Sequence, residues 1–466
     1  MTIFRLNVLL LVLGDALIYT GALAAAIFVR RPGMFSTDYF GDNIGIFLPL
    51  FALWLFFNAV IGMYDFRQIR TLTDLVGDTV LSFFYGLVAS FAVLYMFPPE
   101  AGTPKTNLLV TIVISYLLCF YWRRLWLDLI SSDGFARKVY FLGRPERFEL
   151  MKLDMKNRQY SEYQCVPEEK LAHLVTNLKT PRQHEKQSVK LRKCVDIVVA
   201  DTEALPDPLG NSIVKAAAES EIPVWDYFDF YEKFYQKIPI SEASRGEWIL
   251  THMLKREKYF YPRIKRLSDF TAASGMFIAL SPLFAIIALA IKISDGGTVF
   301  YKQERVGYLG KPFLLWKFRT MVPGADKQMR ISTGQEDDRI TPVGRLLRQY
   351  RLDELPQIFN IIRGEMSFVG PRPLWTGETQ AFEINGFQLR HMVKPGLSGW
   401  AQIYSSAANT TLDIMEKLRY DLYYVKNISP AIDLAILLKT AKRIFQSEKA
   451  MRERNIHSYA AHGAKR

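Results

Sequence analysis

Four long apolar segments near the N-terminus limit the folds that this chain can adopt. They are Leu6–Val29, Ile44–Tyr64, Leu75–Phe97 and Asn107–Ile130. Each has about 20 residues or more, which is the length that an α-helix needs to cross the hydrocarbon core of a bilayer. We therefore predict a region of four transmembrane helices over residues 1–132. The first segment is too long for the apolar core of a secretory signal, and further apolar segments follow it.

The distribution of positive charge favours a cytoplasmic location for both ends of this region. Four crossings return the chain to its starting side, and most of the neighbouring basic residues fall on that side. These residues are Arg5, Arg67, Arg70, Arg123, Arg124, Arg137 and Lys138. Arg30, Arg31 and Lys105 fall on the other side, and the majority decides the orientation. Asp15 and Asp78 interrupt two of the segments, and we expect them to pack against a neighbouring helix or to lie near the interface rather than to relay protons.

After the fourth apolar segment the sequence takes the pattern of a small α/β domain. Lys138–Gly143 and Val195–Ala200 are predicted to be buried parallel strands, Ser212–Ser220 a helix and Ile222–Phe228 a further strand. This alternation predicts a degenerate Rossmann-like domain, with a doubly wound sheet, over residues 133–245.

The first strand–helix turn of this domain lacks the glycines of a dinucleotide site. It reads GRPERF and keeps Gly143 alone, whereas a dinucleotide-binding turn reads GxGxxG. Without those glycines the backbone cannot approach a pyrophosphate, so a structural or regulatory role is favoured over cofactor binding. The three cysteines and six histidines are scattered, and they predict neither a zinc site nor a disulfide framework.

A fifth apolar segment, Phe270–Ile291, lies in the C-terminal region predicted for residues 255–466. Ser281 and Pro282 lie in its middle, where proline removes a helix hydrogen bond and kinks the axis. A complete crossing would place a Lys- and Arg-rich region outside the cell, against the charge distribution. We therefore favour a re-entrant helix over about 268–293, with Ser281 satisfying part of the freed backbone, and keep a kinked fifth span as the alternative.

An acidic pair, Asp353–Glu354, lies inside a strongly basic stretch that runs from Asp337 to Pro373. The arginines of this stretch include Arg339, Arg345, Arg348, Arg351, Arg363 and Arg372. A strand-like run upstream, Val299–Met321, turns at Gly307 and Gly310 and adds more cations. They are Lys302, Arg305, Lys311, Lys317 and Arg319. Such a setting suits chemistry on a phosphate diester, because one carboxylate can attack or hold a metal while the cations bind the anionic substrate.

The residues after the acidic pair predict a short helix. Its expected buried face is Leu355, Ile358, Phe359 and Ile362, with Asp353, Gln357 and Asn360 on the opposite face. Because Pro356 fits only the first turn, the helix should begin at or just after Asp353. Asp353 then either caps the helix or lies beside a phosphate bound at the helix N-terminus, with Glu354 holding Mg²⁺.

Two turns rich in glycine and proline follow this helix, which Gly364 should end. In the first, a short strand leads to two prolines that flank Arg372 and either aim its guanidinium at a phosphate or uracil or simply end the strand. In the second, Val393–Gln402, Trp400 could contact lipid or pack in the core.

Several ordered motifs, from Tyr259 to about Thr440, carry a family resemblance. They are SPLF in the apolar segment, YKQERVGYLGKPFLLWKFRTM, the stretch that begins at Asp337, LDELPQIFN, GEMSFVGPRP and KPGLSGWAQ. Together they resemble the monotopic polyprenyl-phosphate glycosyl-1-phosphate transferases, which initiate bacterial exopolysaccharide and O-antigen assembly. The front half resembles the large subgroup of that family. The expected fold is thus a membrane α-helical bundle plus α/β, with a C-terminal α+β catalytic domain that contains the re-entrant helix.

The resemblance implies roles for particular residues. Asp353 matches the catalytic aspartate, Glu354 the Mg²⁺-associated glutamate, and Ser281–Pro282 the break in the re-entrant helix. The residues expected to bind substrate are Arg348, Lys317, Arg319, Arg345, Arg372 and Gln357. Tyr350 and Arg351 depart from the small polar residues usual at their positions, which bears on the preference for sugar or nucleotide.

The reaction implied by the resemblance has two steps. Asp353 attacks the sugar-linked phosphate of a UDP-sugar, and UMP leaves; undecaprenyl phosphate then takes the sugar phosphate. By analogy with common members of the family, the expected sugar is glucose or galactose. The expected partners are a UDP-sugar, undecaprenyl phosphate, membrane lipids and a second copy of the chain, with no nucleic acid. The net charge of +13 agrees with anionic lipid or phosphorylated substrates. The expected location is the bacterial cytoplasmic membrane, with the catalytic domain on the cytoplasmic face.

Two other functions fit parts of the sequence. A membrane-anchored scaffold would need the apolar segments and the α/β domain but no metal-dependent carboxylate pair. A transferase that moves the sugar alone would release UDP and usually uses a DxD-type metal site, which this sequence lacks.

Overall fold

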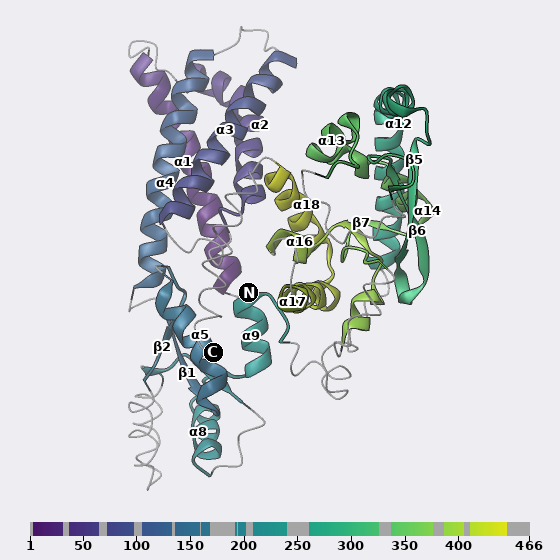
Figure 1. The fold of residues 1–466 in the computed structure, drawn as a ribbon. Helices are drawn as coiled ribbons and strands as arrows, with labels where there is room; N and C mark the ends of the chain where they lie inside the picture. The colour runs from purple at the N-terminus through teal and green to yellow at the C-terminus, as the bar shows by residue number, and fades with distance from the viewer. Residues whose placement is uncertain are drawn as a thin grey trace, which may run out of the picture. The chain divides into compact units, whose positions relative to one another are not determined.

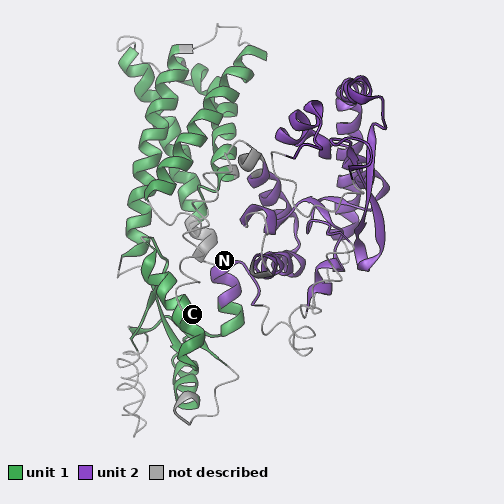
Figure 2. Ribbon diagram, in the orientation of Figure 1, with its two compact units in different colours: residues 1–230, 456–466 green, residues 231–455 purple. Residues whose placement is uncertain are grey.

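The computed structural model describes most of the chain, in segments separated by gaps. The described residues are 3–30, 37–64, 72–96, 105–132, 136–158, 160–167, 192, 194–201, 208–239, 261–325, 337–375, 386–404 and 411–444. They form two compact units, one of which ends at Phe230 while the other begins at Tyr231 (Figure 2).

In its described residues, the first unit begins with a bundle of four long helices (Figure 1). They are α1 (Ile3–Arg30), α2 (Thr37–Ile61), α3 (Leu72–Met96) and α4 (Lys105–Ser131). Each contains a stretch long and apolar enough to cross a membrane, in agreement with the four predicted segments. Helices α1 and α3 each pack against α2 and α4. Leu17, Val80 and Leu125 are exposed, and so much exposed apolar surface indicates a non-aqueous environment.

A polar cluster lies inside this bundle. Asp15 is fully buried and accepts hydrogen bonds from Tyr64 Oη (2.6 Å) and Asn58 Nδ2 (3.2 Å). It also forms an ion pair with Arg123. The expectation that Asp15 and Asp78 pack against neighbouring helices is confirmed by their burial. Arg123, which the charge count placed on the cytoplasmic side, is buried in the bundle, where Asp15 neutralises it.

The bundle is followed by a parallel sheet of four strands in the order β2-β1-β3-β4. The strands are β1 (Arg137–Leu142), β2 (Tyr163–Cys165), β3 (Ile197–Ala200) and β4 (Val224–Asp226), and helices α5 (Pro145–Asn157) and α8 (Pro208–Glu219) accompany them. A doubly wound parallel sheet was predicted, and all four strands are parallel. Strand β2 was not predicted, since a three-residue strand has almost no periodic pattern. The last predicted strand is too long, because Tyr227 and Phe228 already belong to α9 (Tyr227–Tyr235).

The turn after β1 is occupied by an ion-pair cluster. Gly143 has φ +129°, and a Cβ on it would lie 2.5 Å from the Cβ of Asp201. The buried Asp201 carboxylate accepts from Arg144 Nε (2.7 Å) and Arg147 Nη1 (2.6 Å). This turn therefore needs its single glycine for close packing against the end of β3, independently of any ligand.

The second unit contains two small sheets and several short helices around α12 (Tyr261–Asp295). The sheets are an antiparallel hairpin of β5 (Phe300–Val306) and β6 (Pro312–Phe318), joined through η4 (Tyr308–Gly310), and a parallel pair of β7 (Ser367–Val369) and β8 (Gly396–Ser398). The helices are α13 (Pro342–Gln349), η6 (Leu352–Glu354), α14 (Gln357–Arg363), η7 (Phe387–Met392), α16 (Trp400–Tyr404), α17 (Thr411–Asn427) and α18 (Pro430–Ile444). The predicted strand with turns at Gly307 and Gly310 is confirmed as the hairpin.

Helix α12 is bent, with one part seen from the side and the other nearly end-on (Figure 1). Pro282 lacks the N–H that would bind the carbonyl of Ile278, and Ser281 Oγ donates to that carbonyl instead (2.8 Å). Phe359 of α14 contacts α12 on both sides of the break, through Phe277 (ring centroids 5.1 Å apart) and Phe284 (5.8 Å). Both halves of α12 thus pack on the same body.

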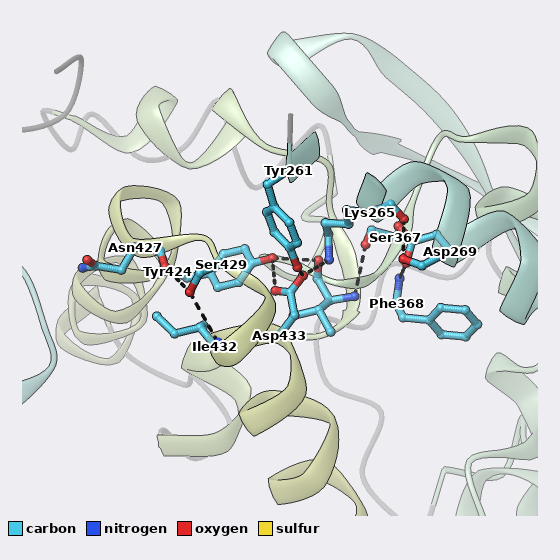
Figure 3. A network of polar contacts seen from close by, with 12 residues as sticks. Tyr261, Lys265, Asp269, Ser367, Phe368, Tyr424, Asn427, Ser429, Ile432 and Asp433 are labelled. Carbon is cyan, nitrogen blue, oxygen red and sulfur yellow. Dashed lines mark hydrogen bonds and ion pairs between the residues drawn. The ribbon is translucent and has the colours of Figure 1, made fainter. Parts of the chain in front are cut away.

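The first turns of α12 are fastened by a buried carboxylate (Figure 3). Asp433 of α18 accepts from Tyr261 Oη and Lys265 Nζ. Its other oxygen accepts from Tyr424 Oη of α17 (2.8 Å), which also contacts the Val369 carbonyl (3.1 Å). These contacts join α12, α17, α18 and β7 into one rigid frame.

Trp400 packs in the core, which decides between the two roles left open by the sequence. Its ring is buried and stacks on Tyr423, with the centroids 5.6 Å apart. Its Nε1 donates to the Gln236 carbonyl (3.2 Å), so the chain just after α9 is tied to this unit.

Candidate active site

The acidic pair lies on the short 3₁₀ turn η6, between α13 and α14. Arg351, with φ +54°, turns the chain into it, and Pro356 is the N-cap of α14. Asp353 therefore does not cap the following helix, as one of the two sequence interpretations had proposed. The turn presents two neighbouring carboxylates outside a regular helix.

Glu354 is held by two cations from distant parts of the chain. Its Oε1 accepts from Lys317 Nζ of β6 (3.2 Å) and from Arg372 Nη2 (3.0 Å), and its side chain is 16% exposed. Burial opposes ionisation of this carboxyl, but the charges of Arg372 and Lys317 outweigh burial and lower the pKa of Glu354 to about 2. Glu354 is therefore ionised near neutral pH, and its low basicity makes it a weak nucleophile.

Asp353 has the opposite electrostatic balance. Burial raises the pKa of Asp353 above its usual value. The positive charges of Lys317 and Arg348 oppose that effect, while the neighbouring Glu354 adds to it. Two adjacent carboxyls thus differ in basicity, and the more basic one, Asp353, is the better candidate for forming a bond to an electrophile.

Arg348 is positioned by the packing of α13 on the end of the hairpin. Its Nε donates to Thr320 Oγ1 (2.9 Å). Helix α13 begins at the N-cap Thr341, whose Oγ1 accepts from Gly344 N (2.9 Å). A Cβ at Gly344 would overlap the Thr320 carbonyl, so only glycine permits this close approach.

A buried asparagine joins β6 to α14 and so fixes Lys317 relative to the acidic pair. Asn360 Oδ1 accepts from Trp316 N (3.1 Å), and its Nδ2 donates to the Leu314 carbonyl (2.7 Å). The four apolar residues predicted to face the core do pack there, with Ile358 fully buried and Leu355, Phe359 and Ile362 partly buried. The expected polar face is wrong at Gln357 and Asn360, which are buried as well. Asn360 satisfies the polar groups of the adjacent strand, and this role leaves no periodic signal in the sequence. Gly364, with φ +83°, ends the helix as expected.

The other residues expected to bind substrate lie in different surroundings. Arg319 forms an ion pair with Asp295 at the end of α12. Arg345 is exposed on α13, and Gln357 is buried at the start of α14. The structure therefore brings Lys317, Arg348 and Arg372 to the acidic pair, whereas Arg319 pairs with Asp295 of α12.

One cation that the sequence did not single out belongs to the same neighbourhood. Lys417 of α17 is partly buried, and burial lowers its pKa, with a further lowering by Arg372. The nearby Asp421 opposes these effects. No sequence pattern links Lys417 to Arg372, because the two residues are brought together only by tertiary packing.

The acidic pair could bind a hard divalent cation whose remaining ligands come from water and substrate. Both partners of Glu354 bind Oε1, so in the described residues Oε2 has no hydrogen-bond donor. No group of three or more His, Cys, Asp or Glu residues that could hold a metal is found among the described residues. Mg²⁺ commonly uses one or two carboxylates together with water and substrate phosphates, and this donor set allows that arrangement.

Comparison with known proteins relates the second unit to bacterial enzymes. Residues 260–447 match the family model described as bacterial sugar transferase. The uncharacterized sugar transferase EpsL of Bacillus subtilis is 38% identical over 185 residues, which are 40% of this chain and 89% of EpsL. The exopolysaccharide production protein ExoY of Rhizobium meliloti is 41% identical over 192 residues, which are 38% of this chain and 83% of ExoY. The chain belongs to the bacterial sugar transferase family.

Longer proteins are also similar to part of this chain. The UDP-glucose:undecaprenyl-phosphate glucose-1-phosphate transferase of Escherichia coli is 40% identical over 191 residues, which are 40% of this chain and 41% of that protein. The match thus spans about two fifths of the longer relative. The family model matches residues 260–447, which include Asp353 and Glu354 and exclude the N-terminal bundle.

Proposed function

We propose that this sugar transferase is a polyprenyl-phosphate hexose-1-phosphate transferase. It moves a sugar 1-phosphate from a UDP-sugar, such as UDP-glucose or UDP-galactose, to undecaprenyl phosphate, and it releases UMP. The product is undecaprenyl-diphospho-sugar, the starter of an exopolysaccharide or O-antigen. The observation that carries this proposal is the unequal carboxyl pair, in which Glu354 is fixed by Lys317 and Arg372 while the pKa of Asp353 is raised.

The chemistry proceeds through a covalent aspartyl-phosphosugar. A carboxylate oxygen of Asp353 attacks the sugar-linked phosphorus, and the bond to the UMP oxygen breaks with its electron pair leaving on UMP. An oxygen of undecaprenyl phosphate then attacks the same phosphorus, and the bond to Asp353 breaks to restore the carboxylate. The acceptor phosphate is already ionised near pH 7, so no general base is needed. Lys317, Arg348 and Arg372 offset charge on the transferring phosphoryl group.

Glu354 would hold Mg²⁺ through Oε2, and the substrate phosphates would supply further ligands. Bound there, the ion would neutralise phosphate oxygens as charge shifts between the attacking and leaving groups. The charges of Arg372 and Lys317 lower the pKa of Glu354 to about 2, which leaves this ligand ionised near neutral pH.

The bent helix α12 supports a membrane-surface location for the site. A helix of 35 residues could cross a bilayer, since about 20 residues suffice. Both of its halves nevertheless contact Phe359 of α14, the helix that follows the acidic pair in the chain. We infer a re-entrant helix that enters the cytoplasmic leaflet of the bacterial cytoplasmic membrane and returns. Asp353 would then lie where a soluble nucleotide sugar meets a lipid-bound phosphate.

Product analysis tests the proposed reaction. Purified full-length protein in lipid discs, given undecaprenyl phosphate, Mg²⁺ and a panel of UDP-sugars, is expected to release UMP with at least one of them. Chelation with EDTA should stop the release, and added Mg²⁺ should restore it. Release of UDP in place of UMP would identify a transferase that moves the sugar alone, and no nucleotide release with any sugar would favour a scaffold.

Cysteine accessibility tests the topology. After replacement of Cys119, Cys165 and Cys194 by serine, Lys311→Cys at the exposed hairpin tip should resist a membrane-impermeant maleimide in intact cells. It should react once the cells are permeabilised. The matched control Met96→Cys, at the exposed end of α3, should react in intact cells. Labelling of Lys311→Cys in intact cells would mean that α12 crosses the membrane.

A further inference from the structure

A buried ion pair outside the acidic turn contacts the backbone of Arg372. Arg390 of η7 and Asp421 of α17 have side chains that are only 5% and 4% exposed. Arg390 Nη2 donates to Asp421 Oδ2 (2.7 Å) and to the carbonyl of Arg372 (2.9 Å). Because a buried guanidinium without a counter-ion is strongly unfavourable, Asp421 is what allows Arg390 to occupy this place.

The contact falls on the turn that carries Arg372. The side chain of Arg372 is 49% exposed, so packing alone does not immobilise it. Its backbone is held on both sides: the Pro371 carbonyl accepts from Gly396 N (2.9 Å), and the Arg372 carbonyl accepts from Arg390. The flanking prolines fix φ on either side. With the backbone so restrained, the guanidinium can reach Glu354 Oε1 at 3.0 Å.

The charges around this turn explain why an acid is needed on α17. Arg372, Arg390 and Lys417 are three neighbouring cations, and Asp421 lies one helical turn after Lys417. Asp421 neutralises Arg390 directly and stabilises the charge on Lys417. Without Asp421 the cations would repel one another, and the turn that carries Arg372 would move away from α17.

We propose that Arg390 and Asp421 are positioning residues for phosphoryl transfer, acting through the backbone of Arg372 on its contact with Glu354. The inference rests on the proposed function, since it assigns a role within that reaction. Neither residue touches the reacting atoms. A displacement of about 1 Å at a transferring phosphoryl group can cost on the order of 100-fold in rate. Losing the pair should therefore lower kcat of UMP release by about 10- to 100-fold while the protein stays folded.

A double-mutant cycle between Arg390→Lys and Arg372→Lys separates positioning from general stability. If Arg390 acts through Arg372, the second substitution should cost little once the first is made, with a coupling of about tenfold or more in kcat. The cycle is measured both by UMP release and by the affinity for UDP. Lys237→Met provides the matched control, because it breaks the ion pair between Lys237, which follows α9, and Glu416 of the same helix α17. It should lower the thermal midpoint and add independently to Arg372→Lys.

The two readouts keep this inference distinct from the proposed function. If wild-type protein releases UMP but the losses at Arg390 and Arg372 simply multiply, positioning is overturned and the reaction stands. If wild-type protein releases no UMP, the reaction is overturned, and the UDP-affinity cycle still decides whether Arg390 acts through Arg372. Should Arg390→Lys fail to fold, the isosteric Asp421→Asn replaces it in the same cycle, with the same coupling expected.

Discussion

The Asp353→Asn protein is expected to lose at least about 1000-fold in UMP release while keeping its fold. An amide oxygen is a much weaker nucleophile than a carboxylate, and the substitution conserves the size of the side chain. The measurement uses a UDP-sugar labelled at the sugar-linked phosphorus, without undecaprenyl phosphate. Wild-type protein should retain the label covalently, whereas the variant should retain none.

Two matched carboxyl substitutions make this result specific. Asp338→Asn changes an exposed acid in the same basic stretch and should label like wild type. Glu354→Gln keeps the nucleophile and loses the anion held by Lys317 and Arg372, so its label should form slowly on Asp353. Peptide mapping locates the label. Label on another residue of the wild-type protein, or near-normal UMP release by Asp353→Asn, would refute the covalent assignment.

The features predictable from sequence were those with one dominant physical cause. Long apolar segments can satisfy their backbone in lipid only as helices, and α1 to α4 lie where those segments do. The acidic pair could be found because its two carboxyls are adjacent among many arginines. The glycines of the hairpin and Gly364 mark backbone conformations that other residues adopt poorly, and the structure has turns or a helix end there.

The features that were missed depend on contacts between distant segments. Asn360 looks like an exposed polar residue on a helix, yet it satisfies the edge of β6. Lys317 and Arg372 meet at one oxygen of Glu354 although they lie 37 and 18 residues away from it. Arg390 and Asp421 are 31 residues apart. The charge count placed Arg123 on the cytoplasmic side, but the sequence does not reveal that Asp15 of α1 pairs with it inside the bundle.

That buried pair gives the largest expected effect on stability. Arg123→Met should destabilise the full-length protein by about 3–5 kcal/mol, because it leaves Asp15 charged and without its counter-ion inside the bundle. The neighbouring Arg124→Met is the matched control. Arg124 and Asp128 form an ion pair with side chains that are 50% and 59% exposed, so its loss should cost no more than about 1 kcal/mol. Thermal unfolding in lipid discs measures both.

The double variant Asp15→Asn/Arg123→Met decides the cause of that loss. If the cost comes from an uncompensated charge, neutralising Asp15 as well should recover part of the stability lost in Arg123→Met. If the cost comes instead from lost packing of the arginine side chain, the double variant should be at least as unstable as the single one. Tyr64 and Asn58 still bind position 15 in either case, since an asparagine oxygen accepts the same hydrogen bonds. A double variant that recovers nothing would therefore show that Arg123 stabilises the bundle by its volume and not by its charge.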